Sequence, residues 1–458
     1  MSSGLLKNVR KTVIPPAVLQ VLSRLQEGGF QAFLVGGCVR DMVRGQQPTD
    51  YDVATDALPD EVERLFRKVV PTGKQHGTVT VLTKGPPVEV TTFRTEGAYL
   101  DGRRPSSVEF HANIEDDLSR RDFTINAMAY DPIREELRDP FGGQRDLLAR
   151  VVRCVGDPDA RFREDGLRSL RAVRFAAVLG LTIDPLTAAA IPRSLPTFRK
   201  IAIERIREEF SKLLLSSRPR FGIELLRSTG LLEVFLPELL EGVGKEQSDA
   251  YADDVFGHAM ATVEAAPADL MMRLSALLHD VAKPRTADPK ASSRQFPGHE
   301  ILGAEMATGI LERLKFPRKT IDAVAGLVRH HRLDHLPDAS NGDLRRFLAT
   351  VGVENIEPQL ALAEANWRGR GKRVDEALGK LSQLRSRIGR VLSAHPPLEA
   401  KALALDGNEI MAVLGVGPSG VVGEATRFLL DQVLESPELN SPGELAALLR
   451  NWAQSRSR

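Results

Sequence analysis

The chain has 458 residues, and its 62 lysine and arginine residues almost balance 61 aspartate and glutamate residues, leaving a net charge of +1. This balance excludes a globally basic protein, so any surface that binds nucleic acid must be local. Two cysteines are too few for a disulfide framework, and the first residues carry no secretory signal. No apolar run reaches the roughly 18 to 20 residues that span a bilayer. We therefore expect a soluble, cytoplasmic protein of about two to four domains.

The predicted elements change in character near residue 150. Before it, VTVL (79–82) and VEVTTF (88–93) are typical of strands joined by a Gly-Pro turn. After it, long helical patterns dominate, such as EDGLRSLRAVRFAAVLG (164–180). We expect an α+β multidomain fold, with an α/β head of mixed sheet and helices followed by an all-α neck and body. The expected boundaries are 18–150 for the head, 151–245 for the helical neck and body, 250–340 for a histidine-containing helical domain and 341–458 for a helical tail.

A pair of carboxylates follows a glycine-rich turn in the head. Asp50 and Asp52 are two residues apart, which on an extended strand places both side chains on one face. Two hard oxygen ligands suit Mg²⁺, which combines protein carboxylates with phosphate oxygens and water. Upstream, Gly36 and Gly37 would let backbone N–H groups approach a polyphosphate, and Arg40 would neutralise its charge. Alone, Asp-x-Asp is also typical of a solvated turn, but the combination favours nucleotidyl transfer.

A predicted helix carries a possible base-reading pair. Asp165, Arg168 and Arg171 recur every three residues and share one side. The opposite side, which would be buried, carries Leu167, Leu170, Val173 and Ala177. A carboxylate only accepts and a guanidinium only donates, so together they match the amino group and ring nitrogen of cytosine or adenine and oppose guanine and uracil. The alternative interpretation is a surface helix with an i, i+3 salt bridge.

The order of these motifs resembles that of class II tRNA nucleotidyltransferases, the CCA-adding enzymes, and the related bacterial poly(A) polymerases. The resemblance covers about residues 18 to 215. It rests on LVGGCVRDMVRGQQPTDYDVAT, PTGKQHGTVTV, VEVTTFRTEGAYLDGRRPSSVEF, LSRRDFTINAMAYD and REDGLRSLRAVRF. In this family the first motif holds metal and phosphate, the fourth checks the ribose, and the last selects the base.

The resemblance implies roles for further residues. Arg121 and Asp122 would contact the sugar and triphosphate, and Arg171 and Arg174 would contact the nucleotide. Glu89 is the best candidate for a third carboxylate near the metals, although a strand-surface glutamate is an equal alternative. The implied partners are tRNA, ATP and CTP, with Mg²⁺ as cofactor and with neither DNA nor a membrane.

A separate set of histidines resembles the metal ligands of HD-domain phosphohydrolases. The predicted ligands are His258, His279, Asp280, His299 and His330. Imidazole suits transition metals, so Ni²⁺, Mn²⁺ or Co²⁺ is expected here. A plausible substrate is a 2′,3′-cyclic or terminal phosphate on a damaged RNA end. The family's closing aspartate is not evident, since His331 stands where one is expected, so a retained but inactive HD fold is the alternative.

Three functions remain open from the sequence. The first is complete CCA addition, and the second is poly(A) synthesis or addition of only part of the CCA end. The segment GAYLDGRRPSSVEF resembles a loop required for the final adenosine, and a strongly basic C-terminal extension is absent; both points favour the first. The third, from another class, is a metal-dependent phosphohydrolase whose head only binds RNA. The intact pair of Asp50 and Asp52 counts against it.

Overall fold

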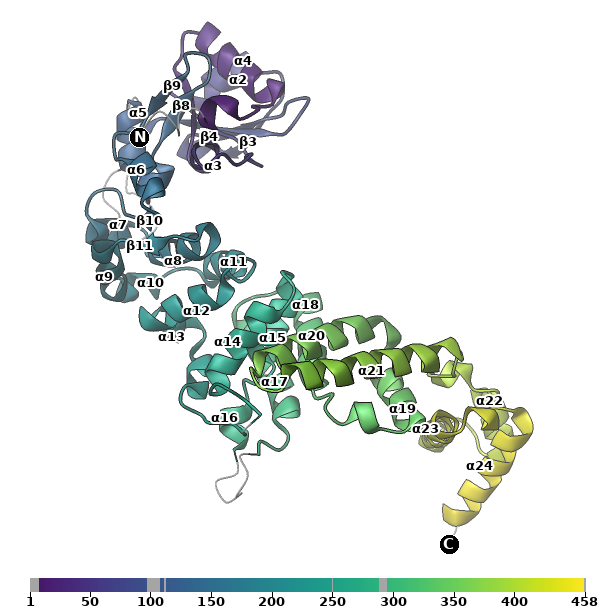
Figure 1. Ribbon diagram of the computed structural model, residues 1–458. Coiled ribbons are helices and arrows are strands. Elements are labelled where there is room, and N and C mark those ends of the chain that lie inside the picture. The colour runs from purple at the N-terminus through teal and green to yellow at the C-terminus, as the bar shows by residue number, and fades with distance from the viewer. Residues whose placement is uncertain (1–7, 97–107, 111–112, 249, 288–294, 457–458) are drawn as a thin grey trace. The chain divides into compact units, whose positions relative to one another are not determined.

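The computed structural model describes residues 8–96, 108–110, 113–248, 250–287 and 295–456 (Figure 1). The chain divides into two compact units, residues 1–237 and 238–458. Residues 97–107, which include most of the loop expected to serve adenosine addition, lie outside the described residues. No helix in the described ranges combines the length and apolar character needed to cross a membrane.

The first unit begins with a seven-stranded mixed sheet in the order β3-β4-β5-β2-β1-β8-β9. Its strands are β1 (Ala32–Val35), β2 (Asp52–Thr55), β3 (Val69–Gly73), β4 (Thr78–Val81), β5 (Val88–Thr92), β8 (Ala129–Asp131) and β9 (Glu136–Arg138). All neighbouring pairs are antiparallel except β2 and β5, which run parallel. β1 is buried along its whole length and β2 is buried after its first residue, which explains their apolar sequences. The sheet confirms the predicted head.

Helices complete the first unit. Those that alternate with the strands along the chain are α2 (Pro16–Glu27), α3 (Gly37–Val43), α4 (Pro59–Leu65), α5 (Ile114–Ser119) and α6 (Gly143–Leu148). The later ones are α7 (Pro158–Glu164), α8 (Leu167–Leu179), α9 (Pro185–Arg193), α10 (Leu195–Phe198), α11 (Ile203–Leu214), α12 (Pro219–Ser228) and α13 (Leu231–Phe235). α8 is the central helix of the neck, because α7, α11 and α12 all contact it. Its predicted apolar side is buried, as expected.

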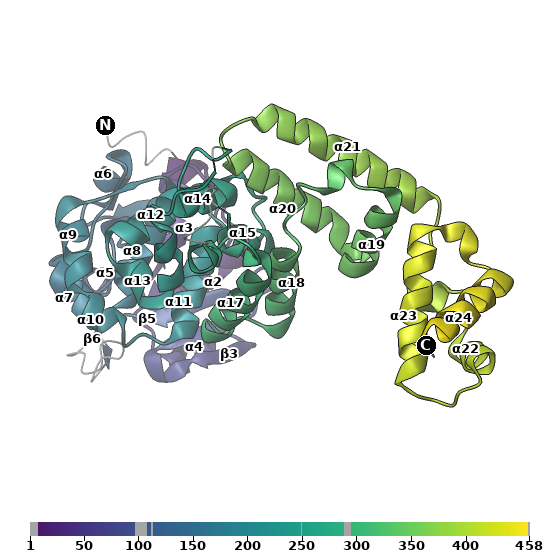
Figure 2. The same cartoon turned by 90° about the horizontal axis from the view of Figure 1, so that it is seen from below.

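The second unit is helical throughout its described residues. Its helices are α14 (Val255–Ala265), α15 (Leu270–Leu278), α16 (Lys283–Thr286), α17 (His299–Arg313), α18 (Arg318–Arg329), α19 (Asn341–Val351), α20 (Ile356–Gly369), α21 (Val374–Ser393), α22 (Gly407–Leu414), α23 (Gly420–Glu435) and α24 (Pro442–Arg456). Figure 2 shows α22, α23 and α24 gathered at the C-terminal end. They share a hydrophobic core of their own that includes Ile410, Leu429 and Leu445. The all-α expectation for this region is confirmed.

Candidate functional site

A cavity of about 610 Å³ in the first unit gathers almost all the residues expected to bind a nucleotide. Its lining comes from the head and from the helical neck, and comprises Gly36, Gly37, Arg40, Asp52, Arg120, Arg121, Asp122, Asn126, Asp165, Leu167, Arg168, Arg171, Arg174, Phe175, Arg205 and Lys212. Eight of these side chains are basic and three are carboxylates. The cavity is therefore a local basic surface in a chain of balanced charge, and it suits a polyanionic ligand.

The predicted metal-binding carboxylates lie at one edge of the sheet. Asp52 is the first residue of β2, and its register partner on the parallel strand β5 is Glu89. Partial burial raises the pKa of Asp52; Arg121 opposes this shift and the charge of Asp50 adds to it. Burial and the charge of Asp52 likewise raise the pKa of Glu89. Burial is the larger cause of both shifts, and the neighbouring carboxylates add to it, so a cation bound here would stabilise the ionised forms.

The three head carboxylates do not form a closed ligand set. Asp50 lies outside the strand, where its Oδ2 accepts a hydrogen bond from Thr49 Oγ1 at 3.2 Å. Within the described ranges, sets of three ligand atoms lying within 4.8 Å of one another occur only in the histidine-containing domain. The donor chemistry of Asp50, Asp52 and Glu89 nevertheless fits Mg²⁺, which takes few protein carboxylates and completes its shell with water and phosphate oxygens.

The glycine turn keeps the space beside Asp52 open. Gly36 has φ +75°, and a Cβ atom placed on it would lie 3.0 Å from Arg121 Nη1 and 3.8 Å from Asp52 Oδ2. A side chain at this position would therefore occupy the gap between the carboxylate and the guanidinium. Arg40 on α3 donates to Asn126 Oδ1 at 2.9 Å and pairs with Asp41. Both arginines are thus held at the mouth of the glycine turn, where a triphosphate would need them.

Asp122 forms a buried ion pair with the neck helix α8. Arg171 donates to Asp122 Oδ2 from Nη2 at 2.6 Å and from Nε at 2.8 Å. Burial alone would raise the pKa of Asp122, but the charge and hydrogen bonds of Arg171 outweigh burial and lower it. Arg121 donates instead to Asp117 at 3.1 Å. The two predicted sugar contacts therefore have separate partners, although both line the cavity.

The structure corrects the placement of Asp165. We expected it on the same helix as Arg168, but it is an extended residue between α7 and α8 and accepts from the backbone N–H of Leu167 at 3.0 Å. Its carboxylate also accepts from Arg205 Nη2 at 2.7 Å. The reason is that Asp165 adopts φ −142°, outside the helical range, so helix periodicity does not apply to it. It still lines the cavity beside Arg168.

Three partners of the predicted residues were missed from the sequence. Arg168 donates to Glu164 Oε2 at 2.5 Å, Arg205 holds Asp165, and Glu209 accepts from Arg174 and, at 3.5 Å, from Arg171. Glu209 is only 4% exposed. A signal for it existed, since it falls within the apolar stripe of α11 formed by Ile206, Phe210 and Leu213.

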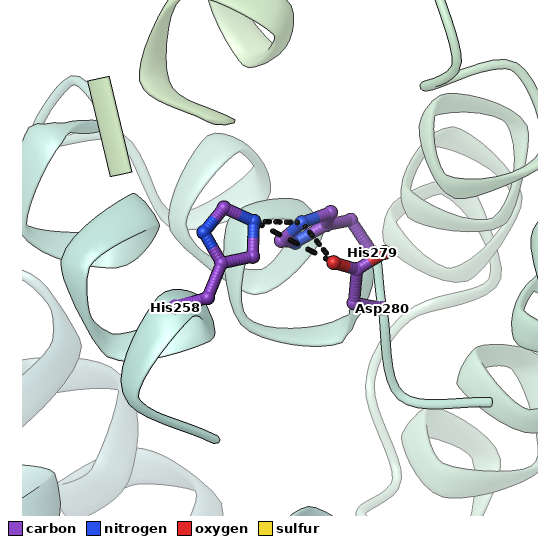
Figure 3. Close-up of side chains that lie close together, drawn as sticks. All are labelled: His258, His279 and Asp280. Atoms are coloured by element: carbon purple, nitrogen blue, oxygen red, sulfur yellow. Dashed lines mark hydrogen bonds and ion pairs between the residues drawn. The ribbon is translucent and has the colours of Figure 1, made fainter. Parts of the chain in front are cut away.

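A second site lies in the other unit, where four histidines surround one aspartate. Figure 3 shows His258, His279 and Asp280 pointing toward one another. Asp280 Oδ2 lies 3.0 Å from His279 Nε2 and 3.5 Å from His258 Nε2. Its other oxygen, Oδ1, lies 3.3 Å from His299 Nε2 and 3.4 Å from His331 Nε2. Asp280 therefore presents each of its oxygens to one pair of imidazoles.

The backbone fixes which nitrogen of each ring faces the centre. The Nδ1 atoms of His279, His299 and His331 lie 2.8, 2.6 and 2.7 Å from the carbonyl oxygens three residues earlier. Because a carbonyl oxygen only accepts, Nδ1 must carry the proton and donate it. In a neutral ring, Nε2 then has no proton and directs its lone pair toward the centre of the cluster. Across the site, Nε2 atoms are 3.1 Å apart between His258 and His279, and 3.3 Å apart between His299 and His331.

Facing lone pairs repel unless a cation or proton lies between them. Burial first, and then the charge of His279, lowers the pKa of His258 to about 3, and burial also lowers that of His331. Burial would raise the pKa of Asp280, but the charges of His279 and Lys283 hold it well below its usual range. Burial thus favours neutral imidazoles at His258 and His331 beside the ionised carboxylate of Asp280, and neutral imidazole with carboxylate is a donor set that suits a transition metal.

His331, rather than the predicted His330, completes this cluster. α18 ends at Arg329, and the two adjacent histidines direct their rings into different cavities. The buried stripe of α18 runs through Val324 and Val328, so a further step of three residues reaches His331. That periodicity was the available signal, and the sequence prediction of His330 did not use it.

The cavity beside the cluster, of about 520 Å³, includes polar residues that were not predicted. Lys283 Nζ forms an ion pair with Asp280 Oδ2 at 2.6 Å and donates a hydrogen bond to Gln247 Oε1 at 2.7 Å. Asn366 on α20 is 4% exposed and its Oδ1 has no hydrogen-bond partner within the described residues. Arg370 completes this side of the cavity, paired with Asp334 at 2.6 Å. A buried amide oxygen without a partner suits a ligand or ion.

Comparison with known families matches three segments of the chain. A Poly A polymerase head domain matches residues 32–153, and a segment described as the probable RNA and SrmB-binding site of polymerase A matches residues 180–242. An HD domain matches residues 256–365, which contain the histidine cluster. The matched segments contain the head motifs and the histidine cluster described above.

Individual relatives and solved structures point to the same family as the matched segments. A CCA-adding enzyme of Lactobacillus delbrueckii subsp. bulgaricus is 47% identical over 49% of the chain, but the match spans only 57% of that enzyme. A CCA-adding enzyme of Geobacillus sp. (strain WCH70) is 36% identical over 87% of both chains. The Bacillus stearothermophilus CCA-adding enzyme in complex with CTP has a TM-score of 0.72, 28% identity, and coverage of 97% of this chain and 99% of that one. The Thermotoga maritima enzyme complexed with tRNA shares the fold, with a TM-score of 0.57, 18% identity, and coverage of 97% and 98%. The chain belongs to the family of CCA-adding enzymes.

Proposed function

We propose that the first unit adds C, C and A to the 3′ end of tRNA from CTP and ATP without a template. The observation that carries this proposal is a single cavity that combines Asp52 with the acceptor and donor Asp165 and Arg168. The relatives solved with CTP and with tRNA support the same substrates here. As part of this proposal, the protein is soluble and cytoplasmic and binds neither DNA nor a membrane.

The residues at the sheet edge would serve the transfer step. Asp50 and Asp52 would hold Mg²⁺, with Glu89 as a third carboxylate beside Asp52. Bound Mg²⁺ would assist in-line attack of the RNA 3′-hydroxyl on the α-phosphate and the departure of pyrophosphate. Gly36 and Gly37 leave room for the triphosphate, and Arg40 and Arg121 neutralise its charge. Little more than positioning and charge stabilisation is asked of the protein.

Base selection would require an exchange of partners in the cavity. Asp165 would turn from Arg205 to accept from the amino group of cytosine or adenine, and Arg168 would turn from Glu164 to donate to the ring nitrogen. Guanine and uracil present the reverse polarity, so they would leave both groups unpaired. Asp122, Arg171 and Arg174 would line the sugar side of the nucleotide.

The decisive experiment uses the purified protein and tRNA that lacks its CCA end. CTP alone should extend it by C and C, and CTP with ATP should complete CCA and then stop. Repeated adenosine addition would instead establish a poly(A) polymerase, and extension only of tRNA ending in CC would establish an A-adding enzyme. No extension with any nucleotide would leave the head as an RNA-binding module.

We also propose a phosphohydrolase activity for the histidine cluster. Its support is the pairing of imidazoles around Asp280, with each pair suited to one divalent transition ion such as Ni²⁺, Mn²⁺ or Co²⁺. A 2′,3′-cyclic or terminal phosphate on an RNA end is the expected substrate class, because its removal frees the hydroxyl needed by the head. The test is hydrolysis by metal-stripped protein reloaded with each ion; no turnover with any of them would return the cluster to a structural role.

A further inference from the structure

We propose that a basic cavity beside the histidine cluster binds the phosphate that precedes the reacting phosphate of an RNA 3′ end. This inference rests on the proposed hydrolase function and narrows its substrate to an RNA strand, rather than a mononucleotide or small phosphate ester. The cavity measures about 560 Å³. It is lined by Glu300, Arg329, His330, Arg332, His335, Leu336, Ala339, Asp343, Arg346, Phe347 and Thr350.

The basic cavity adjoins the cavity of the histidine cluster. Arg332 lines both of them. Glu300 lies between them, with one carboxylate oxygen 3.4 Å from His299 Nδ1 and the other 3.6 Å from Arg332 Nη1. His330 and His331 are consecutive, so their Cα atoms are about 3.8 Å apart, yet the two rings serve different cavities. A ligand that continues from the cluster past Arg332 therefore enters the basic cavity.

Several basic side chains of this cavity are available to an anion. Arg346 is occupied, because it pairs with Asp343, Asp431 and Glu435. The side chains of Arg329, His330 and His335, by contrast, form neither a hydrogen bond nor an ion pair with any described residue. Arg329 can therefore donate to a phosphate with its charge, and the imidazoles can add N–H donors without breaking existing contacts. Burial and the charge of Arg329 lower the pKa of His330, so this ring contributes as a hydrogen-bond donor.

The apolar part of the lining favours a nucleotide over a free anion. Phe347 forms part of the wall; its ring is half-buried because one side packs against the hydrophobic core that contains Leu336, and the rest is left for a ligand. Proteins that bind single-stranded nucleic acid combine a basic groove with aromatic surfaces on which bases stack. A mononucleotide bound at the cluster has no second phosphate to place here, whereas an RNA strand has one on every nucleotide. The cavity therefore distinguishes strand ends from small esters.

The first test compares substrates on the full-length protein loaded with Mn²⁺. For each variant we would measure kcat/KM for a trinucleotide ending in a 2′,3′-cyclic phosphate and for bis(p-nitrophenyl) phosphate. Arg329→Ala with His335→Ala should lower the ratio of the two values about tenfold, and added salt should weaken the RNA reaction less than in the original protein. Lys319→Ala removes an exposed cation from the same helix outside the cavity, and should keep the ratio. An unchanged ratio in the double variant would overturn the proposal.

A second test does not depend on hydrolysis. A trinucleotide with 4-thiouridine at its penultimate position would be photo-crosslinked to the full-length protein, and the crosslinked peptides mapped by mass spectrometry. Crosslinks should fall within residues 318–351, weaken in the double variant and persist in Lys319→Ala. Crosslinks within these residues without turnover would support the phosphate subsite and reject the hydrolase activity. Turnover without crosslinks within these residues would support the hydrolase activity and overturn the subsite.

Discussion

Arg205 on α11 holds the carboxylate of Asp165 with an Nη2–Oδ2 distance of 2.7 Å, and so occupies the acceptor expected to read the incoming base. Arg168, the matching donor, is likewise occupied by Glu164. Both members of the proposed base-reading pair are therefore satisfied by neighbours of opposite charge. In the proposed function, a base that can replace those neighbours would be accepted, and one of reverse polarity would leave charged groups unpaired.

Replacing Asp165 or Arg168 by alanine should loosen the choice among the four NTPs more than it weakens triphosphate binding. The expected loss of discrimination against UTP and GTP is about a hundredfold, because unpaired polar groups no longer penalise them. Single-nucleotide incorporation on tRNA lacking CCA measures it. Arg163→Ala is a matched control, since Arg163 is exposed on the preceding helix outside the cavity. If both variants still discriminate against UTP and GTP as the original protein does, Asp165 and Arg168 form only structural salt bridges.

Asp50→Ala and Asp52→Ala should each reduce the addition of both C and A by at least about a thousandfold, because each would remove a carboxylate from the proposed metal site. Asp60→Ala removes an exposed carboxylate elsewhere in the head and should retain activity. Hydrolysis at the histidine cluster should persist in all three variants. Substantial addition by Asp50→Ala in Mg²⁺ would remove Asp50 from the ligand set, a sharp test because its side chain lies outside the strand.

Gly36→Ala should abolish nucleotide addition, whereas Gly29→Ala should not. Both glycines have positive φ, +75° and +89°, so both substitutions strain the backbone. A Cβ at Gly36 meets Arg121 at 3.0 Å, while a Cβ at Gly29 meets nothing within 4 Å. Comparing CTP affinity in the two variants separates backbone strain from obstruction of the site. Equal losses would show that strain alone is responsible.

Asp122→Asn should destabilise the neck, because Arg171 loses its two short contacts and keeps only Glu209, at 3.5 Å, as a counter-charge; the expected cost is about 1 to 3 kcal/mol. The pKa of Asp122 is lowered in the folded protein. Its stabilising effect is therefore complete above the unfolded pKa of about 3.9 and is lost as pH falls through the folded value. Hydrogen exchange of residues 167–179 between pH 7 and pH 3 would measure both effects. Equal exchange in the variant and the original protein would argue against this pair.

His279→Ala should remove hydrolysis and the stabilisation of the second unit by Mn²⁺, and leave CCA addition nearly intact. Both tryptophans, Trp367 and Trp452, lie in this unit, so their fluorescence reports its unfolding alone. A metal at a hundred times its dissociation constant should add about 2.7 kcal/mol to the free energy of unfolding of the original protein. An equal metal-induced shift in His279→Ala would place the ion elsewhere.

The metal-free second unit should also lose stability as the pH falls below about 6.5. The pKa of His258 is about 3 in the folded protein, compared with 6.5 when exposed, so the unfolded chain binds the additional proton. Tryptophan fluorescence during thermal unfolding at pH 7, 5.5 and 4 would follow the trend. A flat profile would contradict the neutral state assigned to this imidazole.

Local patterns were sufficient to predict much of this molecule. The alternation in VEVTTF predicted β5, and the apolar spacing of Leu170, Val173 and Ala177 predicted the buried side of α8, because each depends only on neighbouring residues. The family was predicted from short motifs that each depend on neighbouring residues, and the comparison with a relative over most of the chain confirmed it. Glu89 was placed beside Asp52 by the parallel register of two strands, a relationship that their separation along the chain does not reveal.

Contacts between distant elements could not be predicted in this way. Arg205 lines the nucleotide cavity from α11, and Glu209 on the same helix binds two arginines of the cavity lining. The helical periodicity of α11 shows that Glu209 is buried, but it does not show which distant residues these side chains meet. Asp165 was misplaced because a single non-helical residue interrupts a helical pattern. His330 was chosen over His331 because adjacent positions differ only in the direction that a helix end gives them.

The carbonyl contacts of His279, His299 and His331 have a consequence for any isolated sample. All three rings are oriented by the carbonyl three residues earlier in the chain, so folding alone sets the direction of their Nε2 atoms. If the cluster binds metal as proposed, such a preorganised nitrogen-rich set would take up divalent ions in the order of their availability and intrinsic affinity. The metal content of a preparation would then record its purification history, and rates from differently prepared samples would become comparable only after chelation and defined reloading.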